Sequence, residues 1–300
     1  MVSWYTYSMW FYLAFLSAFF NALGNIARKT HGSLAQPAEL SWWTLLFSLP
    51  LAFGFLLISH EPHFTSYDFL LPAIGAGVLG SFSAVLQFKA YKDGEASLVA
   101  PIANLLPILL VVTSFLILGV KPNLAGLVGI FFVVGGVYYS SVSGKHDLLH
   151  PLQQILKSKG SRAMLVTVFL WSIQAVLDKI ALATASPAMV LVTILVTMFI
   201  GISAYLLFQP QKHRLRRGEK VFRKWGWHIV AISVFVTLSV MFQLQAIKTV
   251  DPSYVLSVKR LDVLMTVIFS GLFLHERHIM KRIKGSAIAL VGVVIIFLLG

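Results

Sequence analysis

SAVLQFKAYK (Ser83 to Lys92) recurs as SVMFQLQAIK (Ser239 to Lys248), and this repeat indicates how the chain is organised. Four of the ten positions are identical: a Ser, a Gln, an Ala and a Lys. The alignment continues without a gap over residues 83–137 and 239–293, at a constant offset of 156. The chain is therefore interpreted as two copies of one unit.

Apolar segments often match by chance, so the repeated polar residues carry most of the weight. These are the pairs Gln87 with Gln243 and Lys92 with Lys248. The beginning of each copy also matches loosely, with FNALGNIARK at residues 20–29 against LWSIQAVLDK at 170–179. The second match ends on a lysine in both copies.

The composition indicates a protein with many membrane spans. The chain has 300 residues, of which 58% are hydrophobic, and its mean hydropathy is +0.83. Charged residues make up 12%, against about 25% in soluble domains. There is no cysteine, so we expect no disulfide and no thiolate metal or redox site. The beginning, MVSWYTYSMWFYLAF, has no basic residue, which favours a first membrane span over a cleaved signal peptide.

Ten apolar segments emerge, most of them about 20 residues long, which is the length that a membrane helix needs. They cover roughly residues 9–28, 38–59, 69–91, 96–119, 124–142, 162–183, 188–208, 227–248, 253–274 and 282–300. We expect an all-α polytopic membrane protein. Five spans per copy, an odd number, would insert the copies with opposite orientation, as an inverted repeat. The expected units are residues 1–142 and 162–300, with a connector at 143–161.

The basic residues predict the orientation. Loops after odd-numbered spans hold 19 of the 24 Lys and Arg residues, so the positive-inside rule places these loops in the cytoplasm. Residues 143–161 and 211–224 are then cytoplasmic, and both termini lie outside the plasma membrane. The basic segment 211–224, QKHRLRRGEKVFRK, is expected to face anionic lipid rather than nucleic acid.

The predicted ninth span, SYVLSVKRLDVLMTVIFSGLFL (253–274), carries three charged residues: Lys259, Arg260 and Asp262. A charge at mid-bilayer costs about 2.5 kcal/mol or more, so such residues normally face a cavity or a partner. Helical spacing places Lys259, Asp262 and Thr266 on one polar face. We expect Lys259 and Arg260 to bind a carboxylate or phosphate of the substrate. The alternative is an internal salt bridge between Lys259 and Asp262.

Further polar residues in the predicted spans are candidates for the same cavity. They are Asn21, Asn25, Gln87, Trp171, Gln174, Asp178 and Gln243. Structural hydrogen bonds between helices are the alternative for the amides, and an interfacial ion pair is the alternative for Asp178. The carboxylates available for proton coupling are Asp178 and Asp262.

The predicted fourth span, 96–119, contains Pro101 and Pro107, which are expected to act as hinges. The second copy has no proline at either position. Asn104 aligns with Arg260, so the cavity is expected to have one neutral and one charged wall.

YVLSVKRLDVLMTVIFSGLFLHER (254–277), followed by KRIKGSAIALVGVVII (281–296), resembles the last two spans of an EamA-type half. The whole chain resembles the drug/metabolite transporter superfamily, which implies a ten-helix fold that carries small organic solutes across membranes. The run Ser257 to Arg260 is also similar to the ninth-span Lys-Arg pair of organophosphate/triose-phosphate translocators. In that family the pair holds a phosphate, but Asp262 offsets one positive charge here.

These observations predict a secondary transporter that works by alternating access. Its substrate would be a small polar or anionic metabolite, such as an amino acid or another carboxylate, and export is the direction that the resemblance implies. The alternatives are an organophosphate or sugar-phosphate exchanger and a non-transporting scaffold or sensor.

The chain shows no Walker loop, dinucleotide fingerprint, nucleophile elbow or H-E-x-x-H motif, so we expect neither an enzyme nor a bound cofactor or metal. The expected partners are the substrate and the lipid bilayer, and the protein would be a monomer or a homodimer.

Overall fold

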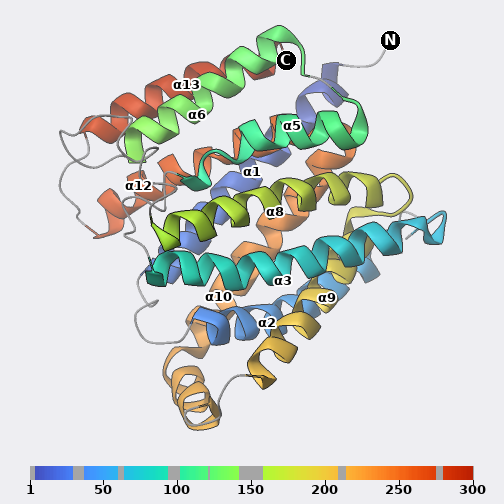
Figure 1. The fold of residues 1–300 in the computed structure, drawn as a ribbon, viewed down its shortest axis with the longest axis vertical. Coiled ribbons are helices and arrows are strands. Elements are labelled where there is room, and N and C mark those ends of the chain that lie inside the picture. The colour runs from blue at the N-terminus through green and yellow to red at the C-terminus, as the bar shows by residue number, and fades with distance from the viewer. Residues whose placement is uncertain are drawn as a thin grey trace.

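The computed structural model describes residues 4–29, 37–59, 64–93, 102–120, 122–141, 158–208, 214–274 and 280–299. This part of the chain is almost entirely helical (Figure 1). The helices are α1 (Trp4–Lys29), α2 (Pro37–Ile58), the short 3₁₀ helix η1 (Tyr67–Phe69), α3 (Leu70–Asp93), α5 (Leu106–Leu118), α6 (Leu124–Ser141), α8 (Lys159–Ala181), α9 (Pro187–Leu207), α10 (Arg214–Thr249), α11 (Pro252–Lys259), α12 (Leu261–Leu274) and α13 (Met280–Leu299).

Within the described ranges, six helices are long and apolar enough to cross a membrane: α1, α2, α3, α8, α9 and α10. Three shorter apolar helices accompany them, at Leu106–Leu118, Leu124–Tyr139 and Ala287–Leu299. The expectation of an all-helical, multi-pass membrane protein is thus met. The full count of ten spans stays a prediction.

The predicted ninth span is not one continuous helix. It is divided into α11 and α12, with Arg260 between them. The backbone tightens there, because the N–H of Arg260 bonds to the oxygen of Ser257 (3.1 Å) and the N–H of Val263 bonds to the oxygen of Arg260 (3.2 Å). Such i to i−3 bonds are typical of 3₁₀ turns, which often mark functional positions within a helix.

The predicted fourth span is interrupted at the matching place. Asn104 and Leu105 form a turn before α5 begins at Leu106. The N–H of Leu105 bonds to the oxygen of Ile102 at 3.0 Å, and the N–H of Ile108 bonds to the oxygen of Leu105 at 3.1 Å. Since Asn104 aligns with Arg260, both copies break their helix at the same position of the repeat.

The basic segment expected to be a loop at 211–224 is helical from Arg214 onward, which corrects that expectation. It forms the first part of α10, a helix of 36 residues. The physical reason is composition: Arg, Lys, Leu and Glu are strong helix formers, and a helix extending beyond the membrane loses nothing by carrying charge.

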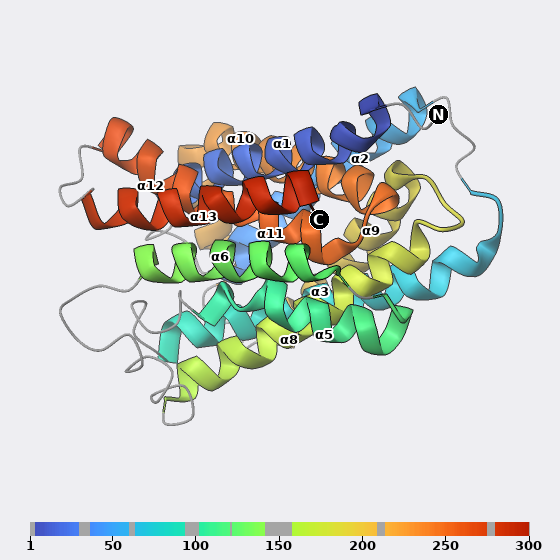
Figure 2. The same ribbon diagram turned by 90° about the horizontal axis from the view of Figure 1, so that it is seen from above.

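Each strong helix pair joins one helix of each copy. Figures 1 and 2 show α6 beside α13, and α1 with α10, α3 with α8 and α2 with α9 are packed in the same way. The pairing is symmetric between the copies. Because α1 corresponds to α8 and α3 corresponds to α10, the pair α1 with α10 is equivalent to the pair α3 with α8. The pair α1 with α12 is likewise equivalent to the pair α8 with α5. The two copies therefore interleave.

Glycines set the distance between α6 and α13. A Cβ on Gly129 would lie 2.8 Å from the oxygen of Gly292, and one on Gly136 would lie 2.5 Å from the oxygen of Gly285. The residue number rises along one helix as it falls along the other, so the two helices are antiparallel. Small residues that let backbones approach are the usual basis of helix packing in membranes.

We predict that Gly136→Ala destabilises the protein by about 1–3 kcal/mol, because the new methyl group must push α13 away. Gly135→Ala is the matched control, since nothing lies within 4 Å of a Cβ added there. Thermal unfolding of the detergent-purified variants measures both. Equal melting temperatures for the two variants would contradict the assigned packing.

Candidate functional site

A cavity of about 660 Å³ lies in the middle of the bundle. Its walls come from both copies. They consist of Asn21, Asn25, Leu45, Gly80, Ser83, Ala84, Gln87, Ala103, Asn104, Leu106, Trp171, Gln174, Ala175, Asp178, Ile194, Leu195, Met198, Val236, Val240, Gln243, Leu256, Lys259, Arg260, Asp262, Val263 and Thr266. All ten residues predicted to bind substrate, and both predicted coupling carboxylates, line this one space.

The break between α11 and α12 forms the charged wall. Lys259 ends α11, Arg260 occupies the turn and Asp262 lies in the first turn of α12. Lys259 Nζ donates a hydrogen bond to Gln243 Oε1 on α10. Three charged residues thus lie within four consecutive positions, at the point where the backbone departs from the regular helical pattern.

Two amides of α1 bond to the polar face of α12. Asn21 Nδ2 donates to Asp262 Oδ2 at 2.5 Å, and Asn25 Nδ2 donates to Thr266 Oγ1 at 3.5 Å. Both pairs advance by four residues, so α1 and α12 run parallel at this contact. The predicted i, i+4 and i, i+3, i+7 spacings are what bring these side chains into register.

The opposite wall contains the second carboxylate. Asp178 lies on the same face of α8 as Trp171 and Gln174, one turn after Gln174, and only 2% of its surface is exposed. Its Oδ1 atom makes no hydrogen bond. Lys259 is close enough to act on it electrostatically. A buried carboxylate oxygen without a donor is costly, which marks Asp178 as a group that a ligand or a proton would satisfy.

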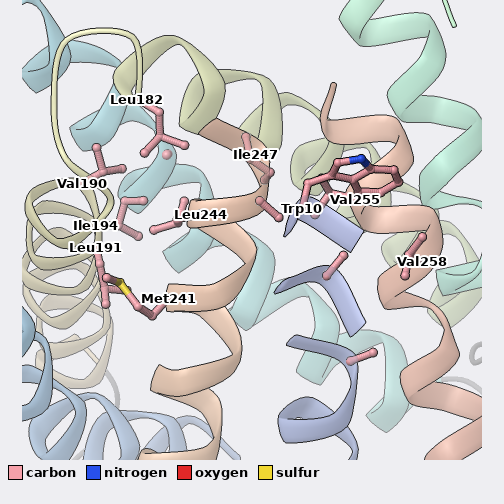
Figure 3. Close-up of a cluster of buried hydrophobic side chains, with 14 of the residues drawn as sticks. Trp10, Leu182, Val190, Leu191, Ile194, Met241, Leu244, Ile247, Val255 and Val258 are labelled. Carbon is pink, nitrogen blue, oxygen red and sulfur yellow. The ribbon is translucent and has the colours of Figure 1, made fainter. Parts of the chain in front are cut away.

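An apolar plug closes one end of the cavity. We define the plug as Trp10, Leu182, Val190, Leu191, Leu244, Ile247 and Val255, all buried (Figure 3). In α1, α9 and α11 the plug residues lie N-terminal to the residues that line the cavity. In α10, and at Leu182 directly after α8, they lie C-terminal to them. The plug therefore lies at the end of the bundle where α8 and α10 finish. From there the cavity extends toward Asn25 and Gln87, near the other ends of α1 and α3.

Of the two prolines predicted to act as hinges, only Pro107 lies in the described part of the chain. Pro101 lies outside the described residues. Pro107 is in the first turn of α5, where a proline costs no helical hydrogen bond. The break comes before it, at Asn104 and Leu105, and the equivalent break at Arg260 has no proline nearby. Proline is therefore not required for the interruption, and a hinge role stays a prediction.

One polar contact was missed from the sequence. Ser17 on α1 and Ser239 on α10 are fully buried, and each hydroxyl donates to the other residue's backbone oxygen at 2.8 Å. The repeat could have indicated Ser239, because it aligns with Ser83, which lines the cavity. Nothing in the sequence pairs it with Ser17.

Comparison with known proteins agrees with this arrangement. The model of the EamA-like transporter family matches twice, at residues 8–142 and 158–298. No curated protein matches the chain. One solved crystal structure has the same fold, with a TM-score of 0.75 and 16% sequence identity over 97% of this chain and 98% of the other.

We predict that Asn21 and Asp262 are energetically coupled, because Asn21 donates a hydrogen bond to one oxygen of the buried Asp262 carboxylate. Asn21→Leu should lower the free energy of unfolding by about 1–3 kcal/mol, the usual cost of an unsatisfied buried polar group. A double-mutant cycle with Asp262→Leu, measured by thermal unfolding, should give a coupling energy above about 0.5 kcal/mol. Additive effects would show that the bond contributes nothing to stability.

Proposed function

The chain belongs to the EamA-like transporter family, and on that premise we propose that it is a secondary active transporter for a small metabolite with an acidic group. The observation that carries the proposal is the cavity itself. It lies between two copies of one unit, and its charged wall stands at a helix break. Transporters built from repeats place their substrate sites in this way, near the membrane midplane and beside discontinuous helices.

We further propose the full topology: ten spans in two inverted copies, residues 1–142 and 162–300, joined by 143–161. In this count α11 and α12 together form the ninth span. The helix directions support it. The parallel contact of α1 with α12 and the antiparallel contact of α6 with α13 are those expected when successive spans alternate in direction.

The proposed substrate anchors are Lys259 and Arg260, with Gln87 and Gln243 as hydrogen-bonding partners. Arginine offers a planar fork that fits a carboxylate, and lysine adds a compact charge. A volume of about 660 Å³ suits a small organic solute. An amino acid or another carboxylate fits these features.

The charges favour a carboxylate over an organophosphate. Two cations line the cavity, Lys259 and Arg260, and so do two carboxylates, Asp178 and Asp262. The formal charges of these four lining residues sum to zero, so a dianionic phosphate would leave an uncompensated charge inside the membrane. A monoanion or a zwitterion would leave less. The sugar-phosphate exchanger is therefore the second candidate.

The two carboxylates differ in their surroundings. Each has a buried Oδ1 atom without a hydrogen bond, but Asp262 Oδ2 accepts a hydrogen bond from Asn21. We therefore assign proton coupling to Asp178, and a structural role in the site to Asp262. A scaffold with the same fold would have no use for a polar cavity, which argues against that alternative, whereas a sensor with a bound ligand would share the cavity and differ by not moving the ligand.

The proposed direction is export across the plasma membrane, which rests on analogy with the family. With the basic loops in the cytoplasm, the plug lies on the outer side and the cavity extends toward the cytoplasm. This arrangement would accept substrate from inside the cell.

We predict that Lys259→Ala and Arg260→Ala each abolish transport in reconstituted vesicles while expression stays normal, because each removes a cation that binds the substrate. Lys284→Ala is the matched control, since this exposed lysine on α13 does not line the cavity. Uptake of radiolabelled amino and organic acids measures all three variants. Wild-type rates in both cavity variants would rule out the anchors.

We predict that Asp178→Asn separates substrate movement from its driving force. The variant should lose accumulation driven by a pH gradient but keep exchange of labelled for unlabelled substrate, because exchange needs no net proton movement. Asp93→Asn, at an exposed carboxylate on α3, should keep both activities. Gradient-driven accumulation by Asp178→Asn would place the coupling elsewhere.

A further inference from the structure

Lys179 makes an unusual connection between two helices. It lies in the last turn of α8, and its Nζ donates to three backbone oxygens at the end of α10. The distances are 2.6 Å to Ile247, 3.2 Å to Lys248 and 3.0 Å to Val250. The last carbonyls of a helix lack partners within it, and they carry partial negative charge. A lysine is therefore a suitable partner, but here it comes from a different helix.

The connection lies at the level of the plug. Lys179 directly follows the cavity residue Asp178, and Ile247 belongs to the plug. The same end is also joined on the other flank of α8, where the N–H of Thr65 bonds to the oxygen of Thr184 at 2.8 Å. Opening this end of the cavity would require α8 and α10 to separate, and Lys179 spans that separation.

In the described part of the chain, the equivalent contact of the first copy is weaker. Exchanging the copies takes the pair α8 with α10 into the pair α1 with α3. Where the structure describes them, α8 and α10 pack against each other, whereas α1 and α3 make few contacts or none. The two ends of the cavity thus differ in the way that alternating access requires.

The repeat also identifies a second lysine in the same place. In the alignment of residues 20–29 with 170–179, Lys179 is equivalent to Lys29, the last residue of α1. The offset of 156 takes the end of α10 to the end of α3, since Lys248 aligns with Lys92. Both halves therefore hold a lysine at the end of one helix and a matching helix terminus for it to cap.

We propose that Lys179 is a gating residue, which holds the plug end closed by capping α10, and that Lys29 closes the opposite end by capping α3 when the cavity faces the other way. This inference rests on the proposed transport function. Lys179 is suited to such a switch, because it lies half-buried at the end of α8, where a long side chain can exchange carbonyl partners for water.

The natural absence of cysteine makes a direct test possible. Leu244→Cys places a single thiol in the plug, and its reaction with a membrane-impermeant maleimide in nanodiscs reports opening of that end. We expect Lys179→Met to raise the labelling rate about tenfold, which corresponds to about 1.4 kcal/mol. Lys179→Arg, which keeps the charge and the donors, should stay at the wild-type rate. Lys29→Met should lower the rate, because it weakens the opposite closure.

A control separates gating from mere destabilisation. Ala289→Cys, buried between α6 and α13, should stay unlabelled in every variant. The proposal is overturned if Lys179→Met leaves the Leu244→Cys rate unchanged, or raises labelling at Ala289→Cys equally. It is also overturned if Lys179→Arg labels as fast as Lys179→Met, or if Lys29→Met fails to lower the rate. Labelling needs no substrate, so failure of the gate is distinguishable from a loss of transport in the Lys259 and Arg260 variants.

Discussion

The intolerance of a membrane interior for unsatisfied charge is the constraint on which the rest of this structure depends. Lys259, Arg260 and Asp262 cannot face lipid, so the helix that carries them must border a polar space. That requirement accounts for the amides of α1 opposite α12, for Gln243 beside Lys259, and for the cavity that they share. The break after α11 belongs to the same solution, because it brings the charged residues together where the backbone itself has polar groups to offer.

The two copies divide the work unequally. They share a fold, a pairing pattern and the position of the helix break, but Asn104 stands in the first copy where Arg260 stands in the second. Among the described lining residues, all four charged ones, Asp178, Lys259, Arg260 and Asp262, come from the second copy, and the first copy contributes only neutral side chains. For the proposed substrate, this inequality would favour one orientation of the acidic group in the cavity.

Much of this could be predicted from the sequence, for identifiable reasons. A polar side chain within an apolar segment is costly, so Asn21, Gln174 and Asp178 were predicted to face a shared polar cavity. The structure places all three in the lining of one cavity. The offset of 156 predicted two copies of one unit, and the family model matches the chain twice. Three features were beyond reach. The break at Arg260 contains no proline or glycine that would predict it. The first part of α10 is so rich in charged residues that the sequence predicted a loop. The hydrogen bonds between Ser17 and Ser239 join residues that no sequence pattern relates.

The interleaved pairing of helices has a consequence for each half of the chain. The strongest partner of α1, α2, α3 and α6 in each case belongs to the other copy, so half of the chain alone would expose these contact faces to lipid. A half-length chain would need a second copy of itself to cover them. In the proposed inverted topology, that second copy would lie antiparallel to the first in the membrane. Asn104 and Arg260 can differ only because both copies belong to one polypeptide.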